Sequence, residues 1–409
     1  MKEKLQKYAR LLIEVGLNIQ KGQNLMISAP IECAEFARMC ASAAYDVGCR
    51  EVIMNWKDDL SDRLKYLKAA DDVFDTYPEW RKEMLTEHAK GGGALLNIYA
   101  TDPENMAGVD HDRLVRSERS AGLALEEYRQ LQMSNTVPWC VASVPIPSWA
   151  AKVFPDAEPD DAIDLLWDAI FNAVRVTDDT DAVEEWRNHI DQLTIRKDRL
   201  NELNLKSLNY KNSLGTDLVV ELPEGHIWAA GSESTKSGQV FVANIPTEEI
   251  FTAPKRDGVN GVIVSSMPFV KDGNIIENFK MTLKDGKIVD VQADKGVEVL
   301  RNAIAVDEGA SYLGEVALVP YDSPISNTKI LFYNTLFDEN ASCHFAFGQA
   351  YPSSIKGGEN MSKGELDRRG INDSITHEDF MVGTEDLSII GITQDGKQIP
   401  IFVDGNFAF

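Results

Sequence analysis

Two of the six histidines, His344 and His377, lie in segments that could bind a metal ion. His344 follows Asp338 and Glu339 in LFDENASCHFAFGQAY, and His377 precedes Asp379 by two residues in SITHEDF. If residues 377–379 are extended, this pair shares one face because strand side chains alternate. A neutral imidazole beside a carboxylate is a usual ligand set for zinc, cobalt or manganese. On these residues alone, a buried histidine with an ordinary hydrogen bond explains each segment equally well.

Two further acidic segments occur in apolar surroundings. Glu248 and Glu249 stand between hydrophobic residues in NIPTEEIF, and Glu315 heads the apolar run in YLGEVALVP. A carboxylate beside a low-dielectric wall needs a partner, and a metal ion is the strongest one available. An exposed strand end would explain Glu315 as well as a metal does. We therefore expect a metal site in the C-terminal half, formed by residues that several strands and helices must bring together.

The first half of the chain alternates strand and helix patterns, which predicts βαβ units and a mostly parallel sheet. Expected strands are residues 24–29, 51–56, 94–100 and 139–144, and expected helices include 32–47, 59–74, 112–133 and 161–174. Neither of the two common glycine-rich phosphate-binding motifs is present, so a nucleotide cradle is not expected.

The pattern changes after a charged helical stretch at 181–205. Short strand-like runs separated by turns such as Lys-Asp-Gly predict a largely antiparallel structure with a few helices. These runs are residues 216–222, 259–265, 279–283, 287–292, 315–320, 329–333 and 398–403. The 409 residues exceed what one core usually serves, so we expect two domains. They are an α/β domain at 1–195 and an α+β catalytic, metal-binding domain at 196–409.

The composition limits the partners. A formal net charge of -24 repels phosphate backbones and anionic lipid surfaces, so neither nucleic acid nor membrane is an expected partner. The sequence has no apolar run of about 18 residues that could span a bilayer. Glu3 and Glu14 interrupt any secretory signal, and the five cysteines form no CxxC pair. We therefore expect a cytoplasmic protein with reduced thiols.

Four segments resemble the aminopeptidase T and aminopeptidase S (PepS) family of metallopeptidases. They are NIPTEEIFTAP (244–254), LGEVALVP (313–320), NTLFDENASCHFAFGQAY (334–351) and HEDFMVG (377–383), and the resemblance extends over essentially the whole chain. It implies a homodimeric exopeptidase of broad specificity that removes N-terminal residues from peptides with two divalent ions, of cobalt, zinc or magnesium. Imidazole and carboxylate ligands also suit manganese. The implied metal ligands are Glu249, Glu315, Glu339, His344, His377 and Asp379.

Within this ligand set, the resemblance implies that Glu315 bridges the two ions and that Tyr351 is the catalytic tyrosine. Glu248 and Glu249 are neighbours, and adjacent strand residues face opposite ways, so we favour Glu249 as the ligand. Glu248 is our candidate for carrying a proton to the leaving amine. Two divalent ions can activate a water molecule and stabilise a developing oxyanion, which are the demands of amide hydrolysis.

Two other classes of function stay open at this stage. Two-metal sites also serve phosphoesterases, and Lys255 and Arg256 follow Glu249 closely enough to meet a phosphate charge. Alternatively, the C-terminal half could be a cation-stabilised dimerisation or peptide-binding module without catalysis. Turnover of an aminoacyl-nitroanilide but not of nitrophenyl phosphate would exclude the phosphoesterase. A chelator that lowers the melting temperature of a protein without any peptide turnover would favour the binding module.

Overall fold

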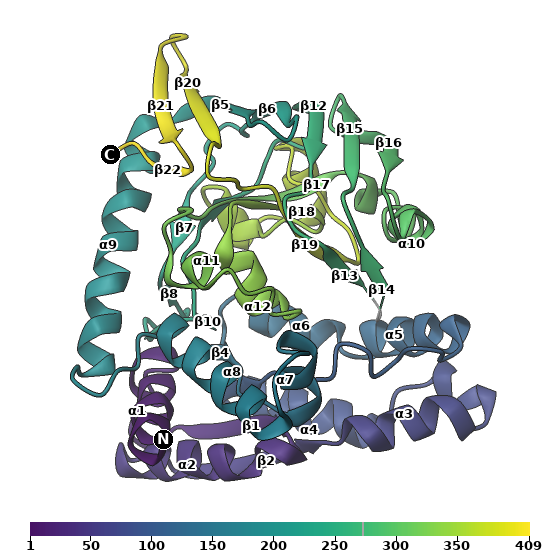
Figure 1. Ribbon diagram of the computed structural model, residues 1–409, viewed down its shortest axis with the longest axis vertical. Coiled ribbons are helices and arrows are strands. Elements are labelled where there is room, and N and C mark those ends of the chain that lie inside the picture. Colours follow the sequence, from purple (N-terminus) through teal and green to yellow (C-terminus); the bar gives the residue numbers. More distant parts are fainter. Residues whose placement is uncertain (272–273) are drawn as a thin grey trace. The chain divides into compact units, whose positions relative to one another are not determined.

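The computed structural model describes residues 1–271 and 274–409 (Figure 1). The chain divides into two compact units: Met1–His189 with Ser232–Pro246, and Ile190–Gly231 with Thr247–Phe409. The division falls inside the helix α9 (Ala182–Leu203), and a short later segment belongs to the first unit. The functional boundary that we place after residue 195 stays a prediction.

The first unit is built on a parallel sheet, as the alternating pattern predicts. Its strand order is β10-β4-β3-β1-β2, and every neighbouring pair is parallel. The strands are β1 (Asn24–Pro30), β2 (Glu51–Lys57), β3 (Ala94–Ile98), β4 (Trp139–Ala142) and β10 (Asn244–Ile245). β1 is buried along almost its whole length, which explains why its sequence is a continuous apolar run.

Eight helices of this unit precede α9. They are α1 (Lys2–Leu11), α2 (Ala34–Asp46), α3 (Asp59–Lys68), α4 (Glu79–Lys90), α5 (His111–Ala124), α6 (Glu126–Met133), α7 (Pro147–Val153) and α8 (Pro159–Ala173). The single helix predicted over 112–133 is wrong, because the chain breaks at Leu125 between α5 and α6. The break follows Gly122, which is the weakest helix former of that segment.

The second unit contains two antiparallel sheets. The larger has the order β16-β15-β12-β6-β5-β20-β21-β22, and the smaller has the order β19-β18-β17-β11-β7. The larger sheet comprises β5 (Leu205–Lys211), β6 (Asp217–Glu221), β12 (Val259–Val264), β15 (Lys280–Lys284), β16 (Lys287–Gln292), β20 (Ser388–Thr393), β21 (Gln398–Val403) and β22 (Asn406–Phe407). The smaller comprises β7 (Ala229–Ala230), β11 (Ile250–Thr252), β17 (Leu313–Leu318), β18 (His344–Gly348) and β19 (His377–Met381).

Short helices and two-stranded ribbons complete the architecture. The helices of the second unit are α10 (Val297–Ala303), α11 (Pro324–Thr328), α12 (Thr335–Asp338) and α13 (Lys363–Arg368). The ribbons are β13 (Phe269–Lys271) with β14 (Asn274–Ile276), and, in the first unit, β8 (Glu233–Ser234) with β9 (Val240–Phe241). Among the described residues, no helix combines the length and the apolar character needed to cross a membrane.

The main hydrophobic cluster of the second unit takes side chains from both sheets. The larger sheet contributes Tyr210 and Ile263, and the smaller contributes Val316, Phe345 and Phe380. Because one face of each sheet packs against this cluster, successive side chains of a strand alternate between the core and the opposite face. The opposite face of the smaller sheet is thereby left for polar side chains.

The strand predicted over 329–333 is also wrong, because this segment is a loop. Lys329 and Tyr333 adopt positive φ angles of 55° and 53°, which interrupt an extended chain. The carboxylate of Asp338 accepts the backbone N–H groups of Phe332 and Asn334 at 2.8 and 3.0 Å, so these donors pair with a side chain instead of a strand. The five cysteines are all buried and free, as expected.

Candidate metal centre

The face of the smaller sheet opposite the core carries the histidines and carboxylates singled out from the sequence. Glu315 is on β17, His344 on β18, and His377 and Asp379 on β19, which are consecutive strands of the sheet. Asp379 and Glu315 both lie opposite Ala346 in the strand register, so they share one face. Because successive side chains of a strand point to opposite faces, the neighbours of these residues along each strand face the core.

A bulge at Gly314 sets the direction of Glu315. Leu313 pairs with Phe347 and Glu315 pairs with Ala346, so β17 has one extra residue at this point. A Cβ atom on Gly314 would lie 2.4 Å from the carbonyl oxygens of both Gly348 and Gln349. Only glycine fits without displacing that backbone, and the extra residue turns Leu313 into the core while Glu315 faces away from it.

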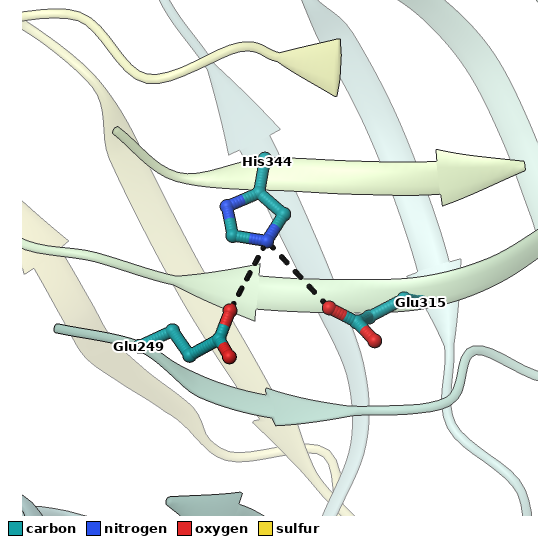
Figure 2. A group of neighbouring side chains, drawn as sticks. All are labelled: Glu249, Glu315 and His344. Atoms are coloured by element: carbon teal, nitrogen blue, oxygen red, sulfur yellow. Dashed lines mark ion pairs between the residues drawn. The ribbon is translucent and has the colours of Figure 1, made fainter. Parts of the chain in front are cut away.

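The first group of potential ligands joins Glu249, Glu315 and His344. In Figure 2 the His344 ring reaches toward both carboxylates. Its Nε2 atom lies 3.3 Å from Oε2 of Glu249 and 3.6 Å from Oε1 of Glu315. Glu249 immediately precedes β11, the neighbour of β17 in the sheet. The three side chains are almost fully buried, so their charges interact in a poorly solvated space.

The second group joins Glu315, His377 and Asp379. Nε2 of His377 lies 3.3 Å from Oδ1 of Asp379 and 3.8 Å from Oε2 of Glu315. Glu315 therefore presents one oxygen to each imidazole and belongs to both groups. A carboxylate so placed is suited to bridge two cations.

The two imidazoles are oriented in the same way by backbone carbonyl groups. Nδ1 of His344 lies 3.1 Å from the carbonyl oxygen of Ser342, and Nδ1 of His377 lies 2.7 Å from that of Gln349. A carbonyl oxygen only accepts, so each Nδ1 carries the proton and donates it. In the neutral ring Nε2 then has a free lone pair that faces the carboxylates. This arrangement is typical of metal-binding histidines, whose other ring nitrogen is held by an outer partner.

Burial and charge perturb the pKa values of the cluster. Burial raises the pKa of Glu315 despite its histidine partners. Burial alone would lower the pKa of His377, but Asp379 and Glu315 outweigh it and raise that pKa to about 10. For Asp379 the neighbouring His377 outweighs burial and lowers the pKa. The neighbouring carboxylates thus favour the protonated form of His377, as expected for a cluster that favours positive charge.

Glu339 lies beside the two groups without belonging to either. It begins a 3-10 turn (Glu339–Ala341) directly after α12. Burial raises the pKa of Glu339 well above its ordinary value, and the charges of Asp379 and Glu249 raise it further. The carboxyl group of Glu339 therefore interacts electrostatically with both acids.

The other two residues expected in the site have different surroundings. Glu248 is buried, belongs to neither ligand group, and donates its backbone N–H to Oδ1 of Asn340 at 2.7 Å. The ring of Tyr351 contacts the imidazole of His377 edge-on, with centroids 5.4 Å apart, and that of Phe251 at 5.8 Å. Tyr351 thus lies next to the second group.

Lys255 and Arg256 are engaged elsewhere. Arg256 pairs with Glu308 and Asp367 at 3.0 Å each, and Lys255 pairs with Asp257 at 3.1 Å. They line a pocket in which acidic residues outnumber the basic ones, and neither ligand group includes a residue of that pocket. Their charges are compensated locally, which removes the sequence argument for a phosphate site.

Two contributors to the geometry were missed in the sequence. Asn340 is fully buried, and Gly314 makes the close backbone approach. The available signals were a polar residue directly after the acidic pair Asp338–Glu339 and a glycine inside an apolar strand. Neither signal reveals the partner, because Glu248 is 92 positions away from Asn340 in the chain.

The donor set fits divalent metal ions. Four carboxylates and two imidazoles gather in or beside the two groups: Glu249, Glu315, Glu339, Asp379, His344 and His377. The two Nε2 atoms are available as ligands, and four negative charges balance two doubly charged cations. Mixed nitrogen and oxygen donors suit several metals, including zinc, cobalt and manganese.

Comparisons with known proteins agree with this chemistry. The family model described as "Thermophilic metalloprotease (M29)" matches residues 1–407. The chain is 47% identical to "Aminopeptidase AmpS" of Bacillus subtilis (strain 168), covering all of this chain and 99% of that protein. It is 46% identical to "Aminopeptidase 2" of Geobacillus stearothermophilus, covering 100% and 98%. The solved structure titled "Wild-type AmpT from Thermus thermophilus" matches with a TM-score of 0.93 and 36% identity, covering 100% of both chains.

Proposed function

This chain belongs to the M29 family of metalloproteases, and on that premise we propose that it is a metal-dependent aminopeptidase of broad specificity. The reaction is hydrolysis of the first peptide bond, which releases the N-terminal residue. The names of its relatives, among them aminopeptidases at 47% and 46% identity over nearly their full lengths, support an exopeptidase.

The observation that carries the proposal is the position of Glu315 between two imidazoles. Its Oε1 faces Nε2 of His344 and its Oε2 faces Nε2 of His377. One ligand group adds Glu249 and the other adds Asp379. We propose that each group holds one divalent ion, that Glu315 is shared, and that Glu339 completes the set.

Divalent ions held by these groups would lower the pKa of a bound water and polarise the scissile carbonyl. The protein's own residues supply the rest. Tyr351, which packs on His377, donates its phenolic hydrogen bond to the oxygen that becomes negative during the reaction. Glu248 takes a proton from the attacking water and passes it to the departing amine. A free amino terminus could bind one ion directly or an acidic group nearby, which would restrict cleavage to the end of the peptide.

The metal and the assembly belong to the same proposal. We propose zinc, cobalt, magnesium or manganese as the ions, since carboxylates and imidazoles accept all of them. Five free buried cysteines support a reducing, cytoplasmic location. The homodimer is supported by the family resemblance, and light scattering of the purified protein tests it.

The test compares Glu315→Gln and Tyr351→Phe on leucine p-nitroanilide with added metal. We expect Glu315→Gln to lose both bound metal and turnover, because it removes the shared charge. We expect Tyr351→Phe to keep its metal and to lose roughly 10²- to 10³-fold in kcat, as for other oxyanion donors. Glu298→Gln, an exposed change in α10, is the matched control. Wild-type rates in both test variants would refute the proposal.

Substrate controls separate the other classes of function. N-acetyl-leucine p-nitroanilide should not be cleaved, because it lacks the free amine. Nitrophenyl phosphate should not be cleaved, because Lys255 and Arg256 are already paired with carboxylates. If chelation lowers the melting temperature but no peptide substrate is ever turned over, a cation-stabilised binding module replaces the enzyme.

A further inference from the structure

We propose that Asn340 is a positioning residue that holds two proposed ligands, Glu249 and Glu339, in place for the metal ions. The inference rests on the proposed metal centre and extends it to a residue outside the ligand set. Neither of these acids lies within a strand of the sheet, so another contact must hold each of them in position. Glu249 precedes β11, and Glu339 begins a 3-10 turn.

The side chain of Asn340 joins the two segments that carry these acids. Its Oδ1 accepts the backbone N–H of Glu248, the neighbour of Glu249, at 2.7 Å. Its Nδ2 donates to the carbonyl oxygen of Leu336 in α12 at 2.9 Å, and to Oε1 of Glu339 at 3.4 Å. One amide group therefore contacts the backbone beside one proposed ligand and the carboxylate of the other.

The direction of the amide is determined by its partners. A backbone N–H can only donate and a carbonyl oxygen can only accept, so Oδ1 must face Glu248 and Nδ2 must face Leu336. Asn340 is fully buried, so water cannot replace either bond at low cost. Aspartate offers the acceptor but not the donor, and leucine offers neither. The site requires both ends of an amide of this length.

The turn that carries Asn340 is itself firmly held. Both carboxylate oxygens of Asp338 accept backbone N–H groups from the preceding loop, at Phe332 and Asn334. The side chain of Asn334 accepts the N–H of Leu336 at 3.1 Å and caps α12. Asn340 thus lies in a turn held by several hydrogen bonds. Its own bond to the N–H of Glu248 then restrains the segment before β11.

The experiment measures metal affinity and kinetics of Asn340→Leu and Asn340→Asp in the full-length protein. The metal-free variants are titrated with Zn²⁺ against a chromophoric chelator. We expect both to bind Zn²⁺ roughly 10- to 100-fold more weakly than wild type, the range for residues that orient ligands. We also expect kcat on leucine p-nitroanilide to fall more than KM rises, because Asn340 is fully buried and acts through the ligands that it holds.

Asn201 provides the matched control for a merely structural role. It makes the same pair of bonds in the same unit, with Oδ1 accepting from the N–H of Trp228 at 2.9 Å and Nδ2 donating to its carbonyl at 3.0 Å. Asn201→Leu should lower the melting temperature but leave Zn²⁺ affinity and kcat unchanged. If Asn340→Leu does not fold, Asn340→Asp and Asn340→Ser carry the test.

The outcomes decide between the two claims. Wild-type Zn²⁺ affinity and kcat in the Asn340 variants, with a lower melting temperature only, would overturn the positioning role. A wild-type protein that binds Zn²⁺ but cleaves no peptide substrate would refute the aminopeptidase and leave the positioning claim to the affinity data. A wild-type protein that binds no divalent cation would overturn both.

Discussion

The candidate centre has one half built on strands and another built on turns. Glu315, His344, His377 and Asp379 project from three consecutive strands whose backbones pair with one another. Glu249 and Glu339 lie outside the strands, and a single asparagine joins their segments. The strand half is positioned by a continuous hydrogen-bonded ladder, whereas the turn half depends on a few side-chain bonds.

This difference predicts how each half responds to mutation. A ladder distributes the positioning over many backbone bonds, so a strand ligand can be removed without moving its neighbours. A turn held by one amide has fewer restraints, and its ligand should be easier to displace. The strand half should therefore determine whether metal binds, and the turn half how tightly and in what geometry.

In the comparison of the two halves, the larger effect is expected on the strand side, from His344→Ala. His344 faces both Glu249 and Glu315 through Nε2, so its loss removes the nitrogen donor of one ligand group. We expect one bound ion to be lost and kcat/KM to fall by more than about 100-fold, beyond the effect of residues that only orient a ligand. Metal analysis and turnover of leucine p-nitroanilide measure the two quantities.

His111→Ala is the control for this change, because His111 is an exposed residue at the start of α5. It should retain the metal content and the rate of the wild type. The comparison between halves breaks down if His344→Ala keeps two ions and full activity, since the strand half would then not govern metal binding.

A smaller effect is expected on the turn side, from Glu339→Gln. Glu339 belongs to neither ligand group, but burial and the charges of Asp379 and Glu249 raise its pKa. We expect metal affinity to weaken by roughly 10- to 100-fold while both ions still bind at saturating metal. A chelator-competition titration gives the affinity, and assays at high metal give kcat and KM.

The same data sharpen the role of Glu339. A raised KM with unchanged metal affinity would mean that the carboxylate contacts the amino terminus of the peptide and is not a metal ligand. Glu298→Gln, an exposed change in α10, should alter neither affinity nor KM.

The fold could be predicted from the sequence where the local hydrophobic pattern alone determines the structure. The parallel sheet of the first unit follows from apolar runs that alternate with helices, and the antiparallel second unit follows from alternating strands. The prediction was wrong at residues 329–333, where Asp338 supplies hydrogen bonds that replace a strand partner. It was also wrong at Leu125. The helical spacing of apolar residues continues through this position, but the helix itself is interrupted between α5 and α6.

The same limit applies to the candidate centre. The spacing of His377 and Asp379 indicated a shared strand face, and the structure places both on β19. The register that brings Glu315 between the two histidines depends on a bulge, which the spacing of residues cannot reveal. The role of Asn340 depends on a contact with Glu248, far away in the chain. Long-range register and turn contacts are set by tertiary packing and not by local pattern.

The most direct test of the account is the metal content of the purified protein at saturating metal, measured by mass spectrometry with turnover assayed before and after chelation. Two ligand groups that share Glu315 predict two divalent ions per chain, with loss of turnover on chelation and recovery when metal returns. Full turnover by a chain that contains no divalent ion would contradict the account.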